Sequence, residues 1–225
     1  ISQHAKEASI PLMIHAAESF AEMEFFFDSQ GAIATDVFPA LGWKELPPAQ
    51  RKTPIAYLSE IGFLEAATSI VVGLHLAAND FPALARNLAR VIWCPSMNNL
   101  MKHGTFPYAK LTEHGVPIGL GTDFWHTRQG FNMWEEMRLA LTNVLLSGPK
   151  PKDVLKMATI GSARALGMDH LVGTLEEGKR SDYIVVGIAP KTETSDDAIY
   201  ESLIKRTEPQ HVQEVVVGDH ILKKI

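Results

Sequence analysis

The chain of 225 residues lacks the features that mark several protein classes. Its single cysteine, Cys94, excludes a disulfide framework and fits a reducing compartment, so we expect a cytoplasmic protein. Positive charge is not in excess, because 21 Lys and Arg residues stand against 26 Asp and Glu residues. Nucleic-acid-binding modules usually carry a basic stripe, so we expect no nucleic-acid partner.

Long hydrophobic runs are also absent. The longest apolar stretch, residues 70–78, is interrupted by His75 and is far shorter than the ~20 residues needed to cross a bilayer, so we expect no membrane segment. No Gly-x-Ser-x-Gly elbow occurs, which disfavours a doubly wound α/β hydrolase. The chain begins with Ile1 and without the layout of a signal peptide, so we expect an N-terminal truncation.

What is present is an alternation of β-branched runs and amphipathic helices in a chain that is 46% hydrophobic. This alternation predicts an α/β fold in which helices connect parallel strands. The expected strands are residues 10–14, 69–74, 91–93 and 116–120. The expected helices are residues 19–29, 54–62, 82–89 and 106–114, with a loop rich in proline and aromatics between the first two.

The C-terminal part has a different pattern. A helix is expected from Asn132, with Glu135 completing a capping-box pattern, and a helical pair over residues 151–166. Glycines then separate strand-like runs. These runs are residues 183–186, 212–217 and 220–222. We therefore expect a small β module at the end of the chain rather than another βα unit.

Polar residues stand at the ends of the four expected strands. His15 follows the first strand, His75 the second, Cys94 the third and Asp123 the fourth. Parallel strands place their carboxyl ends on one edge, where α/β proteins hold their active sites. A lone cysteine at a strand end is more often a small buried hydrophobe than a nucleophile, so Cys94 receives no chemical role.

Imidazole nitrogen and carboxylate oxygen are suitable ligands for Zn²⁺ or a similar divalent ion. We therefore predict that His15 and Asp123 bind a metal. Glu18, three residues after His15, can act as a general acid or base, and His75 can hold a hydroxide or act as a further ligand. The structural alternatives are that Glu18 only stabilises a helix start and that His75 only bonds to a backbone carbonyl.

Several strings along the chain resemble the amidohydrolase superfamily. They are His-Ala-Ala-Glu-Ser at residues 15–19, the strand-end His75, Cys-Pro-Ser-Met-Asn-Asn-Leu at 94–100, the run 113–123 that ends in Gly-Thr-Asp, Glu-Met-Arg-Leu-Ala at 136–140, and the glycine-bounded segment 173–182. They keep the order of that superfamily through almost the whole chain. The branch is similar to cytosine and adenosine deaminases, chlorohydrolases and aminofutalosine deaminases.

The resemblance implies a distorted (β/α)8 barrel that holds one divalent metal, Zn²⁺ or Fe²⁺. His15 would be the ligand from the fifth strand, and Asp123 the ligand from the eighth strand and a proton acceptor. Glu18 would move a proton to the ring nitrogen or leaving group, and His75 would orient the attacking water. The His-x-His pair that this superfamily carries on its first strand has no counterpart here.

The length fits half of such a protein. The positions of His15 and Asp123 give about 36 residues per strand-to-strand repeat, so eight repeats need roughly 290 residues. We therefore predict that residues 1–168 form the C-terminal half of a TIM-type barrel, strands 5–8, as the catalytic domain. Residues 169–225 are expected to form a β-strand tail belonging to a small β-sandwich.

Two functions follow from this sequence. The first is a metal-dependent hydrolase, which deaminates a purine-like or other nitrogen heterocycle as its small-molecule substrate. The alternative is a non-catalytic half-barrel that acts as a binding module, because two metal ligands are too few for a closed site. Exposed strand edges recruit another chain, so the expected partner is a second copy or the missing N-terminal half.

Overall fold

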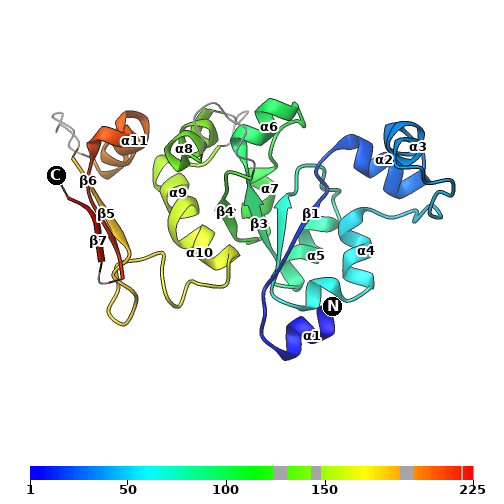
Figure 1. Cartoon of the computed structure of the whole chain (residues 1–225), viewed down its shortest axis with the longest axis horizontal. Helices are drawn as coiled ribbons and strands as arrows, with labels where there is room; N and C mark the ends of the chain where they lie inside the picture. Colours follow the sequence, from blue (N-terminus) through cyan, green and yellow to red (C-terminus); the bar gives the residue numbers. More distant parts are fainter. Residues whose placement is uncertain (124–130, 143–147, 188–194, 219, 225) are drawn as a thin grey trace. The chain divides into compact units, whose positions relative to one another are not determined.

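The structure is a computed structural model that describes residues 1–123, 131–142, 148–187, 195–218 and 220–224. The chain divides into two compact units (Figure 1). Unit 1 comprises residues 1–93 and 98–117, and unit 2 comprises residues 94–97 and 118–225. Each unit is described by itself below.

Unit 1 is built on three parallel strands, β1 (Leu12–Ala16), β2 (Thr68–Val72) and β3 (Arg90–Trp93). β2 lies between the other two, with His15 of β1 opposite Val71 and Val91 of β3 opposite Ile70. Every residue of β2 is buried, as expected for a central parallel strand covered on both faces. The predicted parallel arrangement of these strands is confirmed.

The first strand differs from the prediction in its position. β1 runs over Leu12–Ala16 instead of residues 10–14, so His15 lies within the strand and is exposed. Leu12 forms the first hydrogen bond of the segment, to Ala67, because the pairing with β2 decides where the strand begins. β1 is an edge strand within unit 1, since the described residues of that unit pair with it only through β2.

The helices of unit 1 begin where the sequence supplies caps. Ser19 accepts a hydrogen bond from the Glu22 amide at the start of α2, and Thr53 accepts one from Ala56 at the start of α4, whose first residue is Pro54. The helices and helical turns of this unit are α1 (Ser2–Glu7), α2 (Phe20–Asp28), η1 (Ile33–Val37), α3 (Phe38–Ala40), α4 (Pro54–Glu60), η2 (Phe63–Glu65), α5 (Asp80–Arg86) and α7 (Tyr108–Glu113).

Besides α1 and the short turn η2, two helical regions before residue 118 were not expected. The predicted loop after α2 contains η1 and α3, where the Phe38 ring packs edge-on against Trp43 with 4.8 Å between centroids. The segment after β3 forms α6 (Pro95–Met101), with Pro95 in the first position, where a proline costs no backbone hydrogen bond. Local contacts among aromatic side chains stabilise the first region, which strand and helix periodicity does not capture.

Unit 2 contains β4 (Ile118–Leu120) and the helices α8 (Met133–Thr142), α9 (Pro151–Lys156), η3 (Met157–Gly161) and α10 (Ser162–Ala165). The expected helix start at Asn132 is confirmed, since its side-chain oxygen accepts hydrogen bonds from the amides of Trp134 and Glu135. Ser162 donates to the carbonyl of Leu120 at 2.7 Å and so fixes α10 to the end of β4.

The C-terminal part of unit 2 is a small antiparallel sheet of β5 (Tyr183–Val186), β6 (Val212–Val217) and β7 (His220–Lys224). All three strands were predicted. A further helix, α11 (Asp196–Arg206), was not expected; it lies between β5 and β6 and packs on α8 and α9 (Figure 1). A search of the described helices finds none with the length and apolar character needed to cross a membrane.

Candidate active site

The end of β1 and the loop after it carry two of the predicted site residues. His15 is exposed on the strand, and Glu18 follows it at the start of the turn into α2. The backbone of this turn is unusual, because Ala17 is fully buried and has a φ of +54°, in the left-handed region that residues with a side chain rarely adopt.

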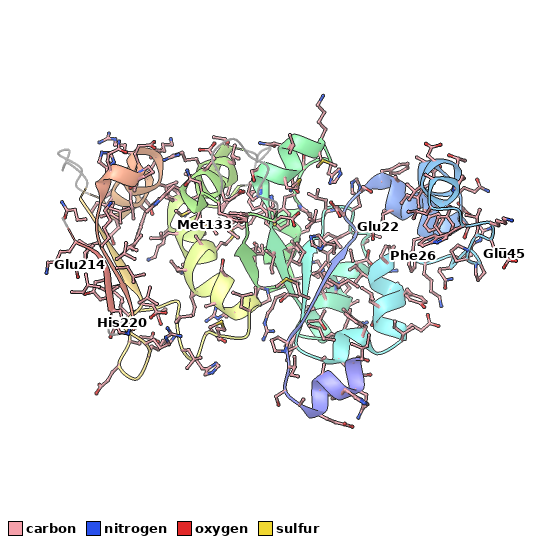
Figure 2. All side chains as sticks on the ribbon, in the orientation of Figure 1. Glu22, Phe26, Glu45, Met133, Glu214 and His220 are labelled. Atoms are coloured by element: carbon pink, nitrogen blue, oxygen red, sulfur yellow. The ribbon has the colours of Figure 1, made fainter. Side chains whose placement is uncertain are left out.

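The carboxylate of Glu22 holds this turn. One oxygen accepts a hydrogen bond from the Ala17 amide at 2.9 Å, and the other accepts one from the Glu18 amide at 2.6 Å. Figure 2 shows Glu22 at the beginning of α2, where its own amide donates to Ser19. A carboxylate that binds two backbone amides is a strong restraint, so Glu22 fixes the direction in which Glu18 leaves the strand.

The same turn is connected to the loop after β2. The carbonyl of Ala17 accepts hydrogen bonds from the amides of Leu74 and His75, at 2.9 and 2.8 Å. That loop begins with a γ-turn, since the Gly73 amide donates to Val71 across Val72, whose φ is +74°. A positive φ is strained for a β-branched residue, and such strain is typical of sites where the backbone must take a fixed direction.

His103, a residue to which the sequence analysis assigned no role, connects His75 and Glu18. The Nε2 atom of His75 lies 2.8 Å from the carbonyl oxygen of His103 and donates to it. The Nδ1 atom of His103 in turn lies 3.6 Å from Oε1 of Glu18. Phe20 lies beside the His75 ring, with 6.5 Å between the centroids. Unit 1 therefore brings Glu18, His75 and His103 into one cluster.

Asp123 belongs to unit 2, where it follows β4 with a φ of +54° and is exposed. Nearby in the same unit, the buried carboxylate of Glu136 accepts hydrogen bonds from the amide and hydroxyl of Ser96. Burial raises the pKa of the Glu136 carboxyl; the bonds from Ser96 oppose this, and the negative charges of Glu135 and Asp123 add to it. Glu136 thus holds the start of α6 and shares the electrostatic surroundings of Asp123.

The donor types agree with the predicted metal, whereas their number falls short within this chain. His15 and Asp123 supply one imidazole and one carboxylate, which Zn²⁺ and Fe²⁺ both accept. In the part of the chain that the structure describes, no three His, Cys, Asp or Glu side chains come together as a ligand set. A catalytic metal site needs about three protein ligands, so these two residues alone would not complete one.

Two other features of the structure lie outside the predicted site. Cys94 is fully buried, as predicted for a small hydrophobe. A cavity of about 660 Å³ in unit 2 is lined mostly by apolar side chains and by none of the predicted site residues. Pockets suited to small molecules usually combine an apolar lining with a few convergent polar groups, and the lining of this cavity includes Asp182 and Tyr183.

Sequence reasoning assigned no role to Glu22, Glu136 or His103. The pattern Ser19-x-x-Glu22 is a readable capping box, although the carboxylate reaches two residues that precede the cap. Glu136 lies 40 residues from its partner Ser96, and His103 lies 28 residues after His75. No local pattern connects residues so far apart in the chain.

The model of the "Amidohydrolase family" matches residues 1–222, which is nearly the whole chain. The chain belongs to the amidohydrolase family. The predicted resemblance is therefore confirmed, and the order of motifs from His15 to Asp182 is the order of this family.

Curated relatives of this amidohydrolase chain are deaminases. A 5-methylthioadenosine/S-adenosylhomocysteine deaminase of Thermodesulfovibrio yellowstonii is 26% identical over 220 residues, which cover 95% of the chain and 45% of the relative. An aminodeoxyfutalosine deaminase of Deinococcus radiodurans is 31% identical over 173 residues, covering 74% of the chain and 41% of the relative. The chain thus spans less than half the length of these relatives.

Solved structures support the fold. An adenosine deaminase from Xanthomonas campestris with bound zinc superposes with a TM-score of 0.77 at 21% identity. The match covers 99% of this chain and 47% of that structure. The parallel β-sheet with its helices and the small antiparallel sheet are therefore an amidohydrolase-type α/β fold.

Proposed function

We propose that this chain is the C-terminal part of a metal-dependent deaminase that replaces the amino group of an adenine-type nucleoside by oxygen. The observation that supports this most directly is the cluster in unit 1, where Glu18 lies 3.6 Å from His103, whose carbonyl accepts a hydrogen bond from His75. The curated relatives named above are deaminases, which favours this function over a non-catalytic half-barrel.

The proposal extends to the domain organisation. Residues 1–168 would contribute strands 5–8 of a (β/α)8 barrel, and residues 169–225 would contribute strands to a small β-sandwich. The exposed edge of β1 supports this, because a closed barrel leaves no strand with an unpaired edge. In the native protein a preceding strand would pair with this edge.

His15 and Asp123 would hold one divalent metal together with donors from outside this chain, Zn²⁺ being favoured by the zinc in the Xanthomonas structure. When bound, such an ion lowers the pKa of a coordinated water to ~7 and so supplies a nucleophile at neutral pH.

The residues of this chain would move the protons of the reaction. Glu18 donates a proton to the ring nitrogen next to the carbon that water attacks, and Asp123 accepts the proton that the water gives up. The carbon–nitrogen bond to the amino group then breaks as Asp123 returns its proton to the amino group, which leaves as ammonia. The new hydroxyl on the ring gives its proton to Glu18 and becomes a carbonyl. The donation from His75 to the His103 carbonyl keeps the His75 ring in a fixed orientation beside this reaction.

The test uses the native full-length protein, its metal content and its release of ammonia. The substrates are adenosine, 5′-methylthioadenosine, S-adenosylhomocysteine and aminodeoxyfutalosine. We expect one equivalent of metal and turnover of at least one of these nucleosides. Asp123→Ala should lose both metal and turnover, and Glu18→Gln should keep the metal and lose about 10²- to 10⁴-fold in kcat, as expected for a general acid.

The matched control is His170→Ala, which removes an exposed histidine outside the predicted site and should change neither measurement. A folded full-length protein that binds no stoichiometric metal and releases no ammonia from these nucleosides would refute the proposed function. Retention of full activity in Asp123→Ala would refute the assignment of that residue.

A further inference from the structure

His103 lies at the centre of the cluster in unit 1, and no pattern in the sequence points to it. Its side chain is 14% exposed, and its Nδ1 atom lies 3.6 Å from Oε1 of Glu18, whose side chain is 31% exposed. These two side chains are therefore partly shielded from water and face one another.

The Nδ1 atom of His103 is buried and makes no hydrogen bond within the described part of the chain. A shielded polar nitrogen without a partner destabilises the folded state, so such atoms are rare and call for an explanation. The Glu18 oxygen is just beyond hydrogen-bonding distance, and a small rotation of either side chain would bring it within reach. Catalytic hydrogen bonds are often this long before the substrate binds.

Hydrogen bonds hold both the amide and the carbonyl of His103, so the backbone restrains the position of its ring. Its amide donates to the carbonyl of Asn98 at 3.2 Å across Lys102, whose φ is +55°. This six-to-one bond with a left-handed residue is the Schellman motif that ends a helix, here α6. The carbonyl of His103 is held by the side chain of His75.

We propose that His103 is a positioning residue for Glu18, whose carboxylate accepts a hydrogen bond from the Nδ1–H of His103 in the native protein and keeps it during the reaction. This inference rests on the proposed function, in which Glu18 delivers a proton to the substrate ring. A glutamate side chain has three rotatable bonds, and a proton transfer needs its carboxyl group within hydrogen-bonding reach of one ring atom. The imidazole removes that freedom by fixing one carboxylate oxygen.

The test is a double-mutant cycle on the native full-length enzyme with the nucleoside that it deaminates best. His103→Ala should reduce kcat on the order of 10- to 100-fold and leave KM nearly unchanged, because misplacing the carboxyl group affects the reaction more than binding. In the Glu18→Ala background the same substitution should have no further effect on kcat. An equal loss in both backgrounds would show that His103 acts independently of Glu18 and would overturn the proposal.

Two variants separate positioning from a general loss of structure. His103→Asn retains a donor near the place of Nδ1 and should recover most of the kcat lost in His103→Ala. If the Asn variant is as slow as the Ala variant although its thermal unfolding matches the wild type, the hydrogen-bond role is wrong. His4→Ala is the matched control, since it removes an exposed histidine of α1 at the opposite end of β1 from Glu18.

If no nucleoside is turned over, the proposed function fails, but the pairing of His103 with Glu18 can still be tested by a second measurement. Nuclear magnetic resonance of protein with labelled histidine should detect a slowly exchanging Nδ1–H of His103. That signal should disappear in Glu18→Ala and remain in His4→Ala. A signal that is absent from the wild type, or that persists in Glu18→Ala, would overturn the pairing of His103 with Glu18.

Discussion

Replacing Glu22 by alanine should loosen the turn that carries Glu18. The substitution removes both acceptors of the Ala17 and Glu18 amides. The Ala17 amide is fully buried and cannot regain a water molecule, so leaving it unpaired should cost about 1–3 kcal/mol. The Glu18 amide lies in a partly exposed residue where water can replace the carboxylate, so its loss should cost less.

We therefore expect the free energy of unfolding to fall by about 2 kcal/mol, which corresponds to a decrease in Tm of roughly 4–8 °C for a chain of this size. Thermal unfolding and urea unfolding both measure this loss. The catalytic efficiency of the native full-length enzyme should fall about tenfold or more, because Glu18 is no longer held in one direction.

The control is Glu24→Ala, which removes an exposed carboxylate two positions further along the same helix. Its effect on unfolding should stay within about 0.5 kcal/mol. Glu22→Gln keeps one acceptor and should fall between the wild type and Glu22→Ala. Equal stability of Glu22→Ala and Glu24→Ala would refute the view that the carboxylate maintains the strained turn.

Two further substitutions test buried contacts in the two units. Burial raises the pKa of Asp80 above its usual 3.8, against the hydrogen bonds from Thr53 and Ala77, so the folded state binds the proton more tightly than the unfolded state. The stabilisation by the protonated form is lost as the pH rises through the raised pKa. Urea unfolding should therefore show that Asp80→Asn gains stability relative to the wild type from pH 3.8 upward. A loss of stability relative to the wild type over this range would contradict the argument. In unit 2, a methyl group at Gly161 would collide with the carbonyl of Ile118. Gly161→Ala should therefore destabilise the protein by about 1–3 kcal/mol, measured by thermal unfolding. An unchanged Tm would show that β4 and η3 separate easily.

Local chemistry explains why much of the fold was predictable. Ser19, Thr53 with Pro54, and Asn132 mark helix starts through bonds that each residue makes within three positions, and the structure contains those bonds. Ile70, Val71 and Val72 of β2 are apolar and buried because both faces of the strand are covered. Such signals lie within a few residues and need no knowledge of the tertiary structure.

Other parts required information that the sequence pattern did not make plain. The start of β1 is decided by pairing with β2, so periodicity placed it two residues too early. α11 does carry local signals, since Ser195 caps its first turn and Lys205 and Arg206 lie in its last turn. The glycines on either side of this segment predict a small β module, and they gave no indication of the helix.

The candidate site divides in the same way. The spacing of His15 and Glu18 is local, and the structure brings Glu18 close to His75 as part of one cluster. The contribution of His103 depends on the Schellman motif at the end of α6 and on a carbonyl bond to a distant loop. Both bonds are made by main-chain atoms of His103, so its residue type does not reveal them.

The link between the loops after β1 and β2 is made almost entirely of main-chain atoms, since the Ala17 carbonyl binds two backbone amides. Bonds of this kind survive the exchange of most side chains around them. The connection can therefore persist while the neighbouring residues diverge, provided that position 17 tolerates a left-handed backbone and position 22 keeps a carboxylate. During evolution the residues around the reaction can therefore change while the position of Glu18 is kept. We expect substitutions of Glu22 to be slow.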